Sequence, residues 1–390
     1  MILGTSAAAE DTALLTDTIR SVIRRTDPVD GRAERVYRDG PVDRDLWAVL
    51  GTEIGVGALA VPEAAGGLGA SFADVAAVLE LLGAELCRVP VLSGVVAAAA
   101  LSRCDGAPRA AELLAGIATG ETVVATVVTA PGTDPGFRAE HVGDDVFVTG
   151  RAGFVVDGDV ADTVLLPAVD ESGTVGLYAV DAAVLTSERM DTTDATRILS
   201  RVRAEAAPAT VLAERAPLGW IHDRAVVALA CESLGVARTC LANAVDYAGR
   251  RVQFGRVIGG FQAIKHMLAE VSVAVELAES AVAHAVWAVV EGSDDDLAEA
   301  AAIAALACGD AARLAVEKNV QVHGGIGFTW EHTAHLYYRR ALTSGVLWGS
   351  GDDHAQRLYA LAAAGAATSS EASTDPRQEP ASAVLSSTES

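Results

Sequence analysis

The spacing of apolar side chains divides this chain into two helical stretches with short strands between them. From residue 10 to 118, apolar residues recur at intervals typical of amphipathic helices. Residues 119–215 instead contain short β-branched runs separated by Asp, Gly and Pro. Helical spacing returns over 216–365. The pattern predicts a mainly α protein: an N-terminal helical domain, a compact antiparallel β domain and a C-terminal helical domain.

Two local patterns refine this division. The expected strands are the β-branched runs 123–128, 146–148, 163–166 and 176–180. In the C-terminal part, one helix carries its apolar residues on a single stripe: Ile264, Met267, Leu268, Val271 and Val275. Residues 366–390 are rich in Ser, Ala, Thr, Glu and Pro with almost no large apolar side chains, so we expect a disordered tail.

A glycine-rich segment, EAAGGLGASF at 63–72, resembles a phosphate-binding loop only superficially. It lacks the lysine of a P-loop and does not match GxGxxG. We therefore interpret it as a connection between helices, with Ser71 as the N-cap of the second helix.

Composition limits the possible partners and compartments. The formal net charge of −23 over 390 residues argues against nucleic acid, although a few local arginines can still hold an anionic cofactor. The N-terminus lacks the pattern of a secretory signal, and no uncharged apolar run is long enough to span a membrane. We expect a cytoplasmic protein without a membrane span. The five cysteines, an odd number without a CxxC pair, are expected to be reduced core residues. His332 and His335 lack further ligands at a suitable spacing, so no metal site is predicted.

Two C-terminal segments carry candidate chemistry: RVQFGRVIGGFQAIKHM at 251–267 and QVHGGIGF at 321–328. A guanidinium offers a fork of donors to phosphate oxygens, and glycine lets backbone approach a ligand closely. Each residue also has an ordinary interpretation. Arg251 could lie on a solvated helix face, and Gly324 with Gly325 could end a helix.

Together and in this order, the two segments resemble the C-terminal signatures of the acyl-CoA dehydrogenase family, and the similarity covers residues 10 to 362. The resemblance implies the family's fold, with a β-barrel-like central domain and a C-terminal four-helix bundle that forms the oligomer interface. It also implies FAD-dependent α,β-dehydrogenation of acyl-CoA thioesters. The positions that match the family's cofactor-binding residues are Arg251, Phe254, Gln262, Gln321, Gly324 and Gly325. In the family, the arginine contacts the flavin pyrophosphate of the neighbouring subunit and the glutamine of FQ reaches the ADP portion.

The β-domain signatures depart from the family pattern. The family's TEPxAGSD segment corresponds at best to residues 129–134, where Ala130 replaces the glutamate and the spacing is shorter. The family's Trp followed by Ile-Thr or Ile-Ser falls at Phe154, Val155 and Val156, which lack a hydroxyl. The resemblance therefore implies that this chain seats the flavin ring poorly in its own β domain.

The catalytic carboxylate of the family also has no clear counterpart. Oxidation α to a thioester needs a base for the C2 proton. Counting back from Arg357 places Ser350 at the usual glutamate, and the position used by other members, 26 residues before Arg251, is Ala225. The carboxylates and imidazole that remain as candidate bases are Asp223, Glu232, Asp352, Asp353 and His354.

These features favour a subunit of a heterotetrameric acyl-CoA dehydrogenase that completes the flavin site of a homologous partner subunit. Such an enzyme would act on an acyl-CoA thioester, including those of steroid degradation, and pass electrons to an acceptor flavoprotein. Two alternatives remain open at this stage. One is a homomeric enzyme with a relocated base, and the other is a non-catalytic scaffold of the same fold.

Overall fold

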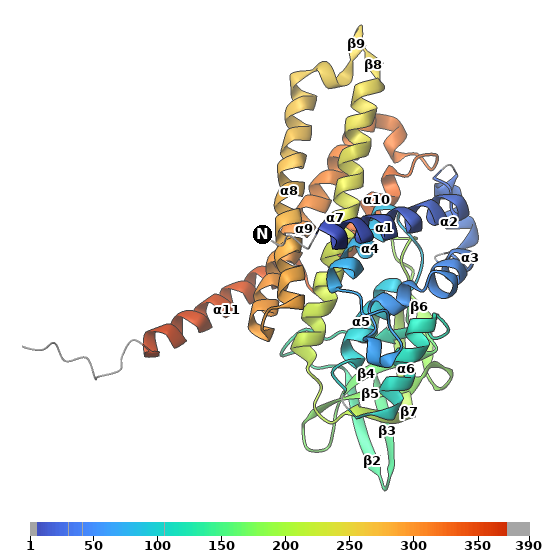
Figure 1. Ribbon diagram of the computed structural model, residues 1–390, viewed down its shortest axis with the longest axis vertical. Helices are drawn as coiled ribbons and strands as arrows, with labels where there is room; N and C mark the ends of the chain where they lie inside the picture. The colour runs from blue at the N-terminus through green and yellow to red at the C-terminus, as the bar shows by residue number, and fades with distance from the viewer. Residues whose placement is uncertain (1–5, 30, 41, 105, 373–390) are drawn as a thin grey trace, which may run out of the picture.

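The computed structural model describes residues 6–29, 31–40, 42–104 and 106–372. Within them, N-terminal helices lie between a β sheet at one end of the molecule and long C-terminal helices that extend to the other end (Figure 1). Helix α4 packs on α7, whereas α5 packs on both α7 and strand β1. The predicted fold class, two helical parts around a β-barrel-like part, is confirmed.

The N-terminal part consists of helices, of which α4 and α5 are the most deeply buried. Its elements are α1 (Ser6–Thr26), α2 (Arg32–Asp39), α3 (Arg44–Trp47), η1 (Ala48–Glu53), η2 (Val56–Leu59), η3 (Glu63–Ala65), α4 (Phe72–Ala84), α5 (Val91–Leu101) and α6 (Pro108–Thr119). Ser71 caps α4 as predicted, and Asp74 completes a capping box by accepting the Ser71 N–H at 3.1 Å. A Cβ at Gly67 would lie 1.7 Å from the Val61 carbonyl oxygen. Gly67 therefore allows close packing of the connection.

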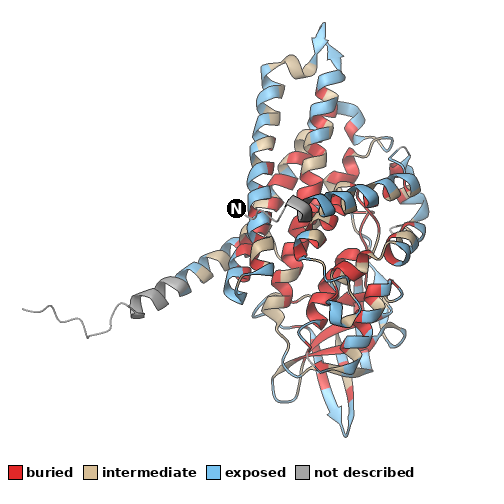
Figure 2. Cartoon of the chain, viewed as in Figure 1, coloured by how far each residue is buried: buried red, intermediate tan, exposed pale blue. Residues whose placement is uncertain are grey.

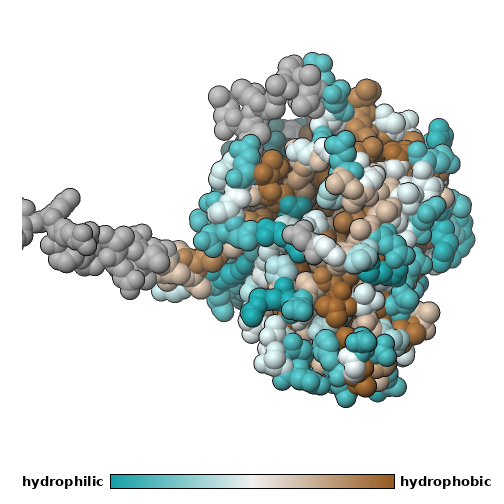
Figure 3. Space-filling model, turned by 60° about the horizontal axis from the view of Figure 1, so that its bottom comes forward, coloured by the Kyte–Doolittle hydropathy of each residue, from teal (hydrophilic) through white to brown (hydrophobic). Residues whose placement is uncertain are grey.

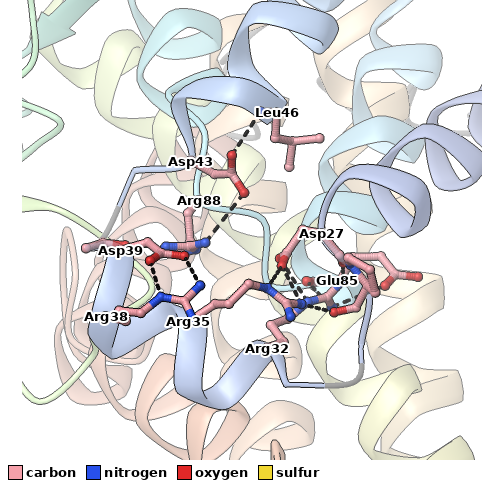
Figure 4. Close-up of polar contacts among 11 residues, drawn as sticks. Asp27, Arg32, Arg35, Arg38, Asp39, Asp43, Leu46, Glu85 and Arg88 are labelled. Atoms are coloured by element: carbon pink, nitrogen blue, oxygen red, sulfur yellow. Dashed lines mark hydrogen bonds and ion pairs between the residues drawn. The ribbon is translucent and has the colours of Figure 1, made fainter.

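A buried arginine ties the first helices to the end of α4 (Figure 4). The Arg32 guanidinium donates to the main-chain carbonyls of Glu85, at 2.8 Å, and Asp27, at 2.5 Å. It also pairs with the carboxylates of Asp27 and Glu85, at 3.0 and 3.4 Å. Burial alone would lower the pKa of Arg32, but Asp27 and Glu85 raise it, so the side chain remains charged.

The β part is a barrel-like sheet. Its strands are β1 (Val124–Thr126), β2 (Phe137–Val142), β3 (Asp145–Val156), β4 (Thr163–Val169), β5 (Val175–Asp181), β6 (Thr186–Arg189) and β7 (Leu199–Ala213), with a short turn η4 (Ala182–Val184). The order β4-β2-β3-β7-β5 closes because β5 also pairs with β4. The expectation of a purely antiparallel domain is wrong, since β4 runs parallel to β1 and β2. Apolar side chains from alternating positions, among them Phe137, Val148 and Leu166, fill the interior.

The C-terminal part is dominated by three long helices that run side by side (Figure 1). Its elements are α7 (Leu218–Arg250), β8 (Val252–Gln253), β9 (Arg256–Val257), η5 (Ile258–Gly260), α8 (Gln262–Val290), α9 (Asp294–His323), η6 (Gly324–Phe328), α10 (Ala334–Ser344) and α11 (Gly351–Ala372). Helix α11 continues to Ala372, into the segment for which the sequence predicts disorder. Residues 373–390 of that segment lie outside the described residues. The five cysteines are reduced thiols buried in the core, as predicted.

Two helices, α7 and α8, are long and apolar enough to cross a membrane by composition alone. Most of α7 is buried in the core, which accounts for its composition. Helix α8 differs, because its outer side is largely exposed (Figure 2). The exposed fractions of Val273, Leu277 and Val290 are 59%, 64% and 50%. Apolar patches also interrupt the polar surface in another view (Figure 3).

A buried ion network joins the β part to the C-terminal helices. Arg340 on α10 pairs with Glu232 on α7 and with Asp194 in the segment before β7, the latter at 3.0 Å. Arg197 reaches the other Glu232 oxygen at 2.9 Å. Burial alone would raise the pKa of Glu232, but Arg197 and Arg340 together hold it below its usual value. The network therefore fixes how the barrel sits on the helices.

We predict that Arg340→Ala destabilises the chain by about 3–5 kcal/mol, because it leaves the Asp194 carboxylate buried without its cationic partner and Glu232 with only Arg197. Chemical denaturation measures the effect. Arg313→Ala is the matched control. Among the described residues, this exposed arginine pairs only with Asp310 and Glu317 on its own helix, so the change should cost less than about 1 kcal/mol. Equal losses in the two variants would contradict this account of the network.

Candidate functional site: a presented helical tip and a separate apolar cavity

The first signature segment forms the turn between α7 and α8. Val252 pairs with Val257 and Gln253 with Arg256, which leaves a two-residue turn of Phe254 and Gly255. Both turn residues have positive φ, 52° and 75°. A two-residue hairpin turn requires this conformation if it is to match the natural twist of the two strands. A phenylalanine rarely adopts this conformation, and its ring is 92% exposed. Phe254 is thus held in a strained conformation in which its side chain is open to contact with another molecule.

The second signature segment ends α9 beside this turn. The rings of Tyr247 on α7 and His323 on α9 stack with centroids 4.3 Å apart. His323 Nδ1 lies 2.8 Å from the Asn319 carbonyl, so it donates its proton there and serves the packing of the helix end. Gly324 has φ 65°, and a Cβ added at Gly324 or Gly325 would meet nothing within 4 Å. The space in front of both glycines is open.

All six sequence-predicted cofactor residues therefore lie at one end of the helical domain, where β8 and β9 project furthest in Figure 1. Every one of them is exposed: Arg251, Phe254, Gln262, Gln321, Gly324 and Gly325. Arg250 is paired with Asp246, but in the described part of the chain no carboxylate is within ion-pair distance of Arg251. We call this group of six residues the presented tip. It offers an uncommitted guanidinium, an aromatic ring and open main chain.

The β-domain segments identified by sequence meet in a different place, an apolar cavity of about 630 Å³ between the barrel and the α10–α11 connection. Ala130, Phe154 and Val155 line it, together with Trp348 and Gly349 from the connection. The polar side chains in its wall are the hydroxyls of Thr192, Thr193 and Thr343. Val156 faces elsewhere, into the packed core. The cavity has the volume of a ligand site but no charged group.

Arg251 of the presented tip lies far along α7 from the chain's own cavity. His222, near the start of α7, contacts the main chain of Trp348 in the cavity wall at 2.8 Å. Arg251 follows the end of the same helix, 29 residues further on (222 to 251). At 1.5 Å per residue this separation is about 43 Å, far beyond the length of one dinucleotide.

Ser350, the residue at the expected glutamate position, caps helix α11. Its Oγ donates to Asp353 Oδ2 at 2.6 Å, and the Asp353 carboxylate also accepts the Ser350 N–H at 2.9 Å. These bonds lower the pKa of Asp353, with the Ser350 side chain as the largest cause. The sequence SGDD at 350–353 contains this capping-box signal, which our sequence analysis missed. Ser350 and Asp353 thus form a helix N-terminus.

Two of the other candidate bases, Asp223 and Glu232, are already paired with arginines. Asp223 pairs with both terminal nitrogens of Arg357, one at 2.7 Å. Glu232 belongs to the buried network. Asp352 is exposed, whereas His354 is buried against Gly349. Burial is the largest cause that lowers the pKa of His354, and the nearby His222 and Arg357 lower it further. Ala225 is wholly buried in the core.

His222 is a structural residue that the sequence did not reveal. Arg357 only donates, so His222 Nδ1, 3.0 Å from it, must accept, and Nε2 carries the proton donated to the Trp348 carbonyl. Trp348 and Gly349 have φ of 63° and 129°. His222 and the Asp223–Arg357 pair therefore hold an unusual main-chain turn in the cavity wall.

The comparisons agree with this architecture. The acyl-CoA dehydrogenase N-terminal domain model matches residues 9–121, and the C-terminal domain model matches residues 222–363. The chain is 34% identical to the acyl-CoA dehydrogenase IpdE2 of Mycobacterium tuberculosis, over 90% of this chain and 96% of that protein. The chain belongs to the acyl-CoA dehydrogenase family, whose members are oxidoreductases that generally bind FAD.

Two solved structures are similar over almost their full length. One is described as the steroid acyl-CoA dehydrogenase Tcur3481–Tcur3483, with TM-score 0.84, 30% identity and coverage of 92% of this chain and 99% of that chain. The other is the ChsE4–ChsE5 complex from Mycobacterium tuberculosis, with TM-score 0.84, 25% identity and coverage of 93% and 99%.

We predict that Ser350→Ala weakens the first turn of α11 by about 1 kcal/mol, because the cap hydroxyl is lost, whereas Ser350→Gly costs only a few tenths. Hydrogen exchange of the amides at 351–354 measures the change. Unaltered exchange in Ser350→Ala would show that the hydroxyl does not cap this helix.

Proposed function

We propose that this chain is a subunit of a heteromeric FAD-dependent acyl-CoA dehydrogenase and that its presented tip completes the flavin site of a homologous partner. The observation that carries the proposal is the separation of Arg251 from the chain's own cavity along α7. A flavin held by Arg251 must place its ring in another subunit. The two similar solved structures that contain two different chains by their names, Tcur3481–Tcur3483 and ChsE4–ChsE5, support a heteromeric assembly.

The residues of the tip fit the phosphate end of FAD. Arg251 has no competing carboxylate among the described residues and can donate two parallel hydrogen bonds to a phosphate. The main chain at Gly324 and Gly325 is open to close approach, and Gln262 and Gln321 supply amides beside it. When bound, FAD supplies the acceptor for the hydride that leaves the β carbon of the acyl group.

This chain's own cavity fits the flavin ring less well than the presented tip fits the phosphate end of FAD. Volume is sufficient, but the wall offers three threonine hydroxyls and main-chain groups as its polar contacts, and Ala130 stands where a glutamate is expected from the family pattern. Ser350 caps a helix, and both Asp223 and Glu232 are bound by arginines. A carboxylate that takes the C2 proton is thus expected in the partner subunit.

The exposed face of α8 is the proposed surface for subunit contact. Val273 and Leu277 are one helical turn apart and project from a helix that is largely uncovered on that side. Exposed apolar residues in such a row are typical of oligomer interfaces. The partner would cover them with its own helical domain.

The substrate we propose is an acyl-CoA thioester with a bulky, steroid-derived acyl group, because one similar solved structure is described as a steroid enzyme. An acceptor flavoprotein would then reoxidise the FAD. The best-supported alternative is a homomeric acyl-CoA dehydrogenase that uses its own cavity of about 630 Å³ for the flavin ring and a relocated base. His354, which is buried and not ion-paired in the described residues, would be the base to test in that case.

We predict that the isolated chain binds little FAD and that the purified complex holds about one flavin per pair of unlike subunits. Absorbance of flavin released from a known amount of each chain gives the ratio. A tightly bound flavin in every copy of the isolated chain would favour the homomeric alternative.

We also predict that Arg251→Ala in the complex weakens FAD binding by about 2–4 kcal/mol, since a charge-assisted contact to the pyrophosphate is lost. Titration of the apo-complex with FAD measures the affinity. Arg250→Ala is the control, because this neighbouring arginine is already paired with Asp246 and should change affinity little. The same affinity in both variants would remove Arg251 from the flavin site, as expected for a non-catalytic scaffold.

A further inference from the structure

Strand β3 leaves its regular pairing just where it enters the wall of the apolar cavity. Its register with β7 shifts between Ala152 and Val155, so Gly153 and Phe154 form a bulge. Phe154 has φ 58°, and Asp157, directly after the strand, has φ 57°. A left-handed conformation costs a phenylalanine more than an aspartate. Something outside the strand must therefore hold this segment in place.

The Asp157 side chain is the best-placed group to do so. It is 7% exposed, and its Oδ2 accepts a hydrogen bond of 2.6 Å from Ser93 Oγ on helix α5. Its main-chain N–H donates to Ile198, and its carbonyl accepts from Val160 and Ala161. Asp157 thus joins the end of the bulged strand to the N-terminal helices, three residues after Phe154.

A small polar chamber of about 30 Å³ lies next to this carboxyl. Charged side chains from each part of the fold line it: Arg88, Asp157, Arg197, Glu232 and Arg340. Arg197 Nε is buried there without a hydrogen-bond partner in the described residues. A polar space of this volume, with several donors and acceptors around it, is large enough and polar enough to hold an ordered water molecule.

We propose that Asp157 is a positioning residue: bonded to Ser93 and, through ordered water, to Arg197, it sets the place of residues 153–157 and hence the shape of the apolar cavity. The inference does not depend on whether this chain donates its tip to a partner. It concerns only the wall of its own cavity.

Protonation of Asp157 should govern this contact. Burial raises the pKa of Asp157 to about 6, against the lowering effects of Ser93 and Arg197, while Asp159 and Glu232 raise it further. The other charged groups around the chamber, Arg88 and Arg340, are committed to Asp43, Asp194 and Glu232. Because the pKa of Asp157 in the folded chain exceeds the usual aspartate value, the protonated side chain stabilises the fold. This stabilisation is complete in acid and is lost as pH rises through about 6.

The test uses three variants of the full chain without flavin. Asp157→Asn keeps the protonated shape and tolerates the left-handed conformation. Asp157→Gly accepts the same conformation but lacks the bond to Ser93. Asp159→Asn is the control, since this nearby carboxylate instead pairs with Arg189. Melting temperature and tryptophan emission are followed from pH 4.5 to 8.5. Trp348→Phe, which removes the indole from the cavity wall, identifies the part of the emission that reports on the cavity.

We expect the emission of Trp348 to change with a midpoint near pH 6 in the parent chain and at a somewhat lower pH in Asp159→Asn, which removes one of the charges that raise the pKa of Asp157. No such change is expected in Asp157→Asn. Asp157→Asn should melt several degrees higher than the parent at pH 8 and show a much smaller difference at pH 4.5. In Asp157→Gly the emission should be independent of pH and typical of a more exposed indole.

Two results would overturn the proposal. A transition near pH 6 that persists in Asp157→Asn would assign it to another group, such as His222 or His354 beside Trp348. Identical emission from Asp157→Gly and Asp157→Asn would mean that the bond to Ser93 positions nothing. The flavin content of any complex affects neither result, so this test and that of the proposed function fail independently.

Discussion

The ion network around Glu232 and Arg340 is the interaction on which the rest of the structure depends. It joins α7, α10 and the segment before β7 at a point that is buried from bulk solvent. Buried ion pairs add little net stability compared with apolar packing, but an unpaired member is very costly. The network therefore restricts the barrel to one position and orientation against the helices. That position determines the cavity between them and the course of the α10–α11 connection.

The same arrangement separates the two places where we propose that the chain contacts a ligand, the presented tip and the cavity. Helix α7 starts beside the cavity, at His222, and ends at the presented tip, at Arg251. A rigid helix of this length keeps Arg251 away from the cavity of its own chain. Under the proposed function, subunit assembly is then a condition for a complete flavin site. A chain whose cavity has lost polar contacts can still contribute through its tip.

The sequence predicted the elements whose signals are local. The cap at Ser71, the apolar stripe that includes Val271 and Val275, and the strands around Val148 and Leu165 follow from short-range patterns. Strand β7 was missed because charged residues alternate along it on the barrel's outer side, as at Arg201 and Arg203. The parallel pairing of β4 with β1 was also not predictable, since it joins residues far apart in the chain.

The candidate site likewise has a part that local motifs predict and a part that depends on the fold. The residues of the presented tip were found from motifs, and the structure adds that they lie together and are exposed. The pairings of Asp223 with Arg357 and of Glu232 with two arginines needed the fold, because their partners lie more than 30 residues away in sequence. Those pairings decide which carboxylates are free, which sequence spacing alone could not.

A structure of the assembled complex would test the central claim most directly, through the position of the isoalloxazine ring. Our account predicts that the flavin pyrophosphate lies against Arg251 of this chain while the ring lies in the partner subunit's cleft. A ring seated between Phe154 and Trp348 of this chain, with its pyrophosphate held by the partner, would contradict it.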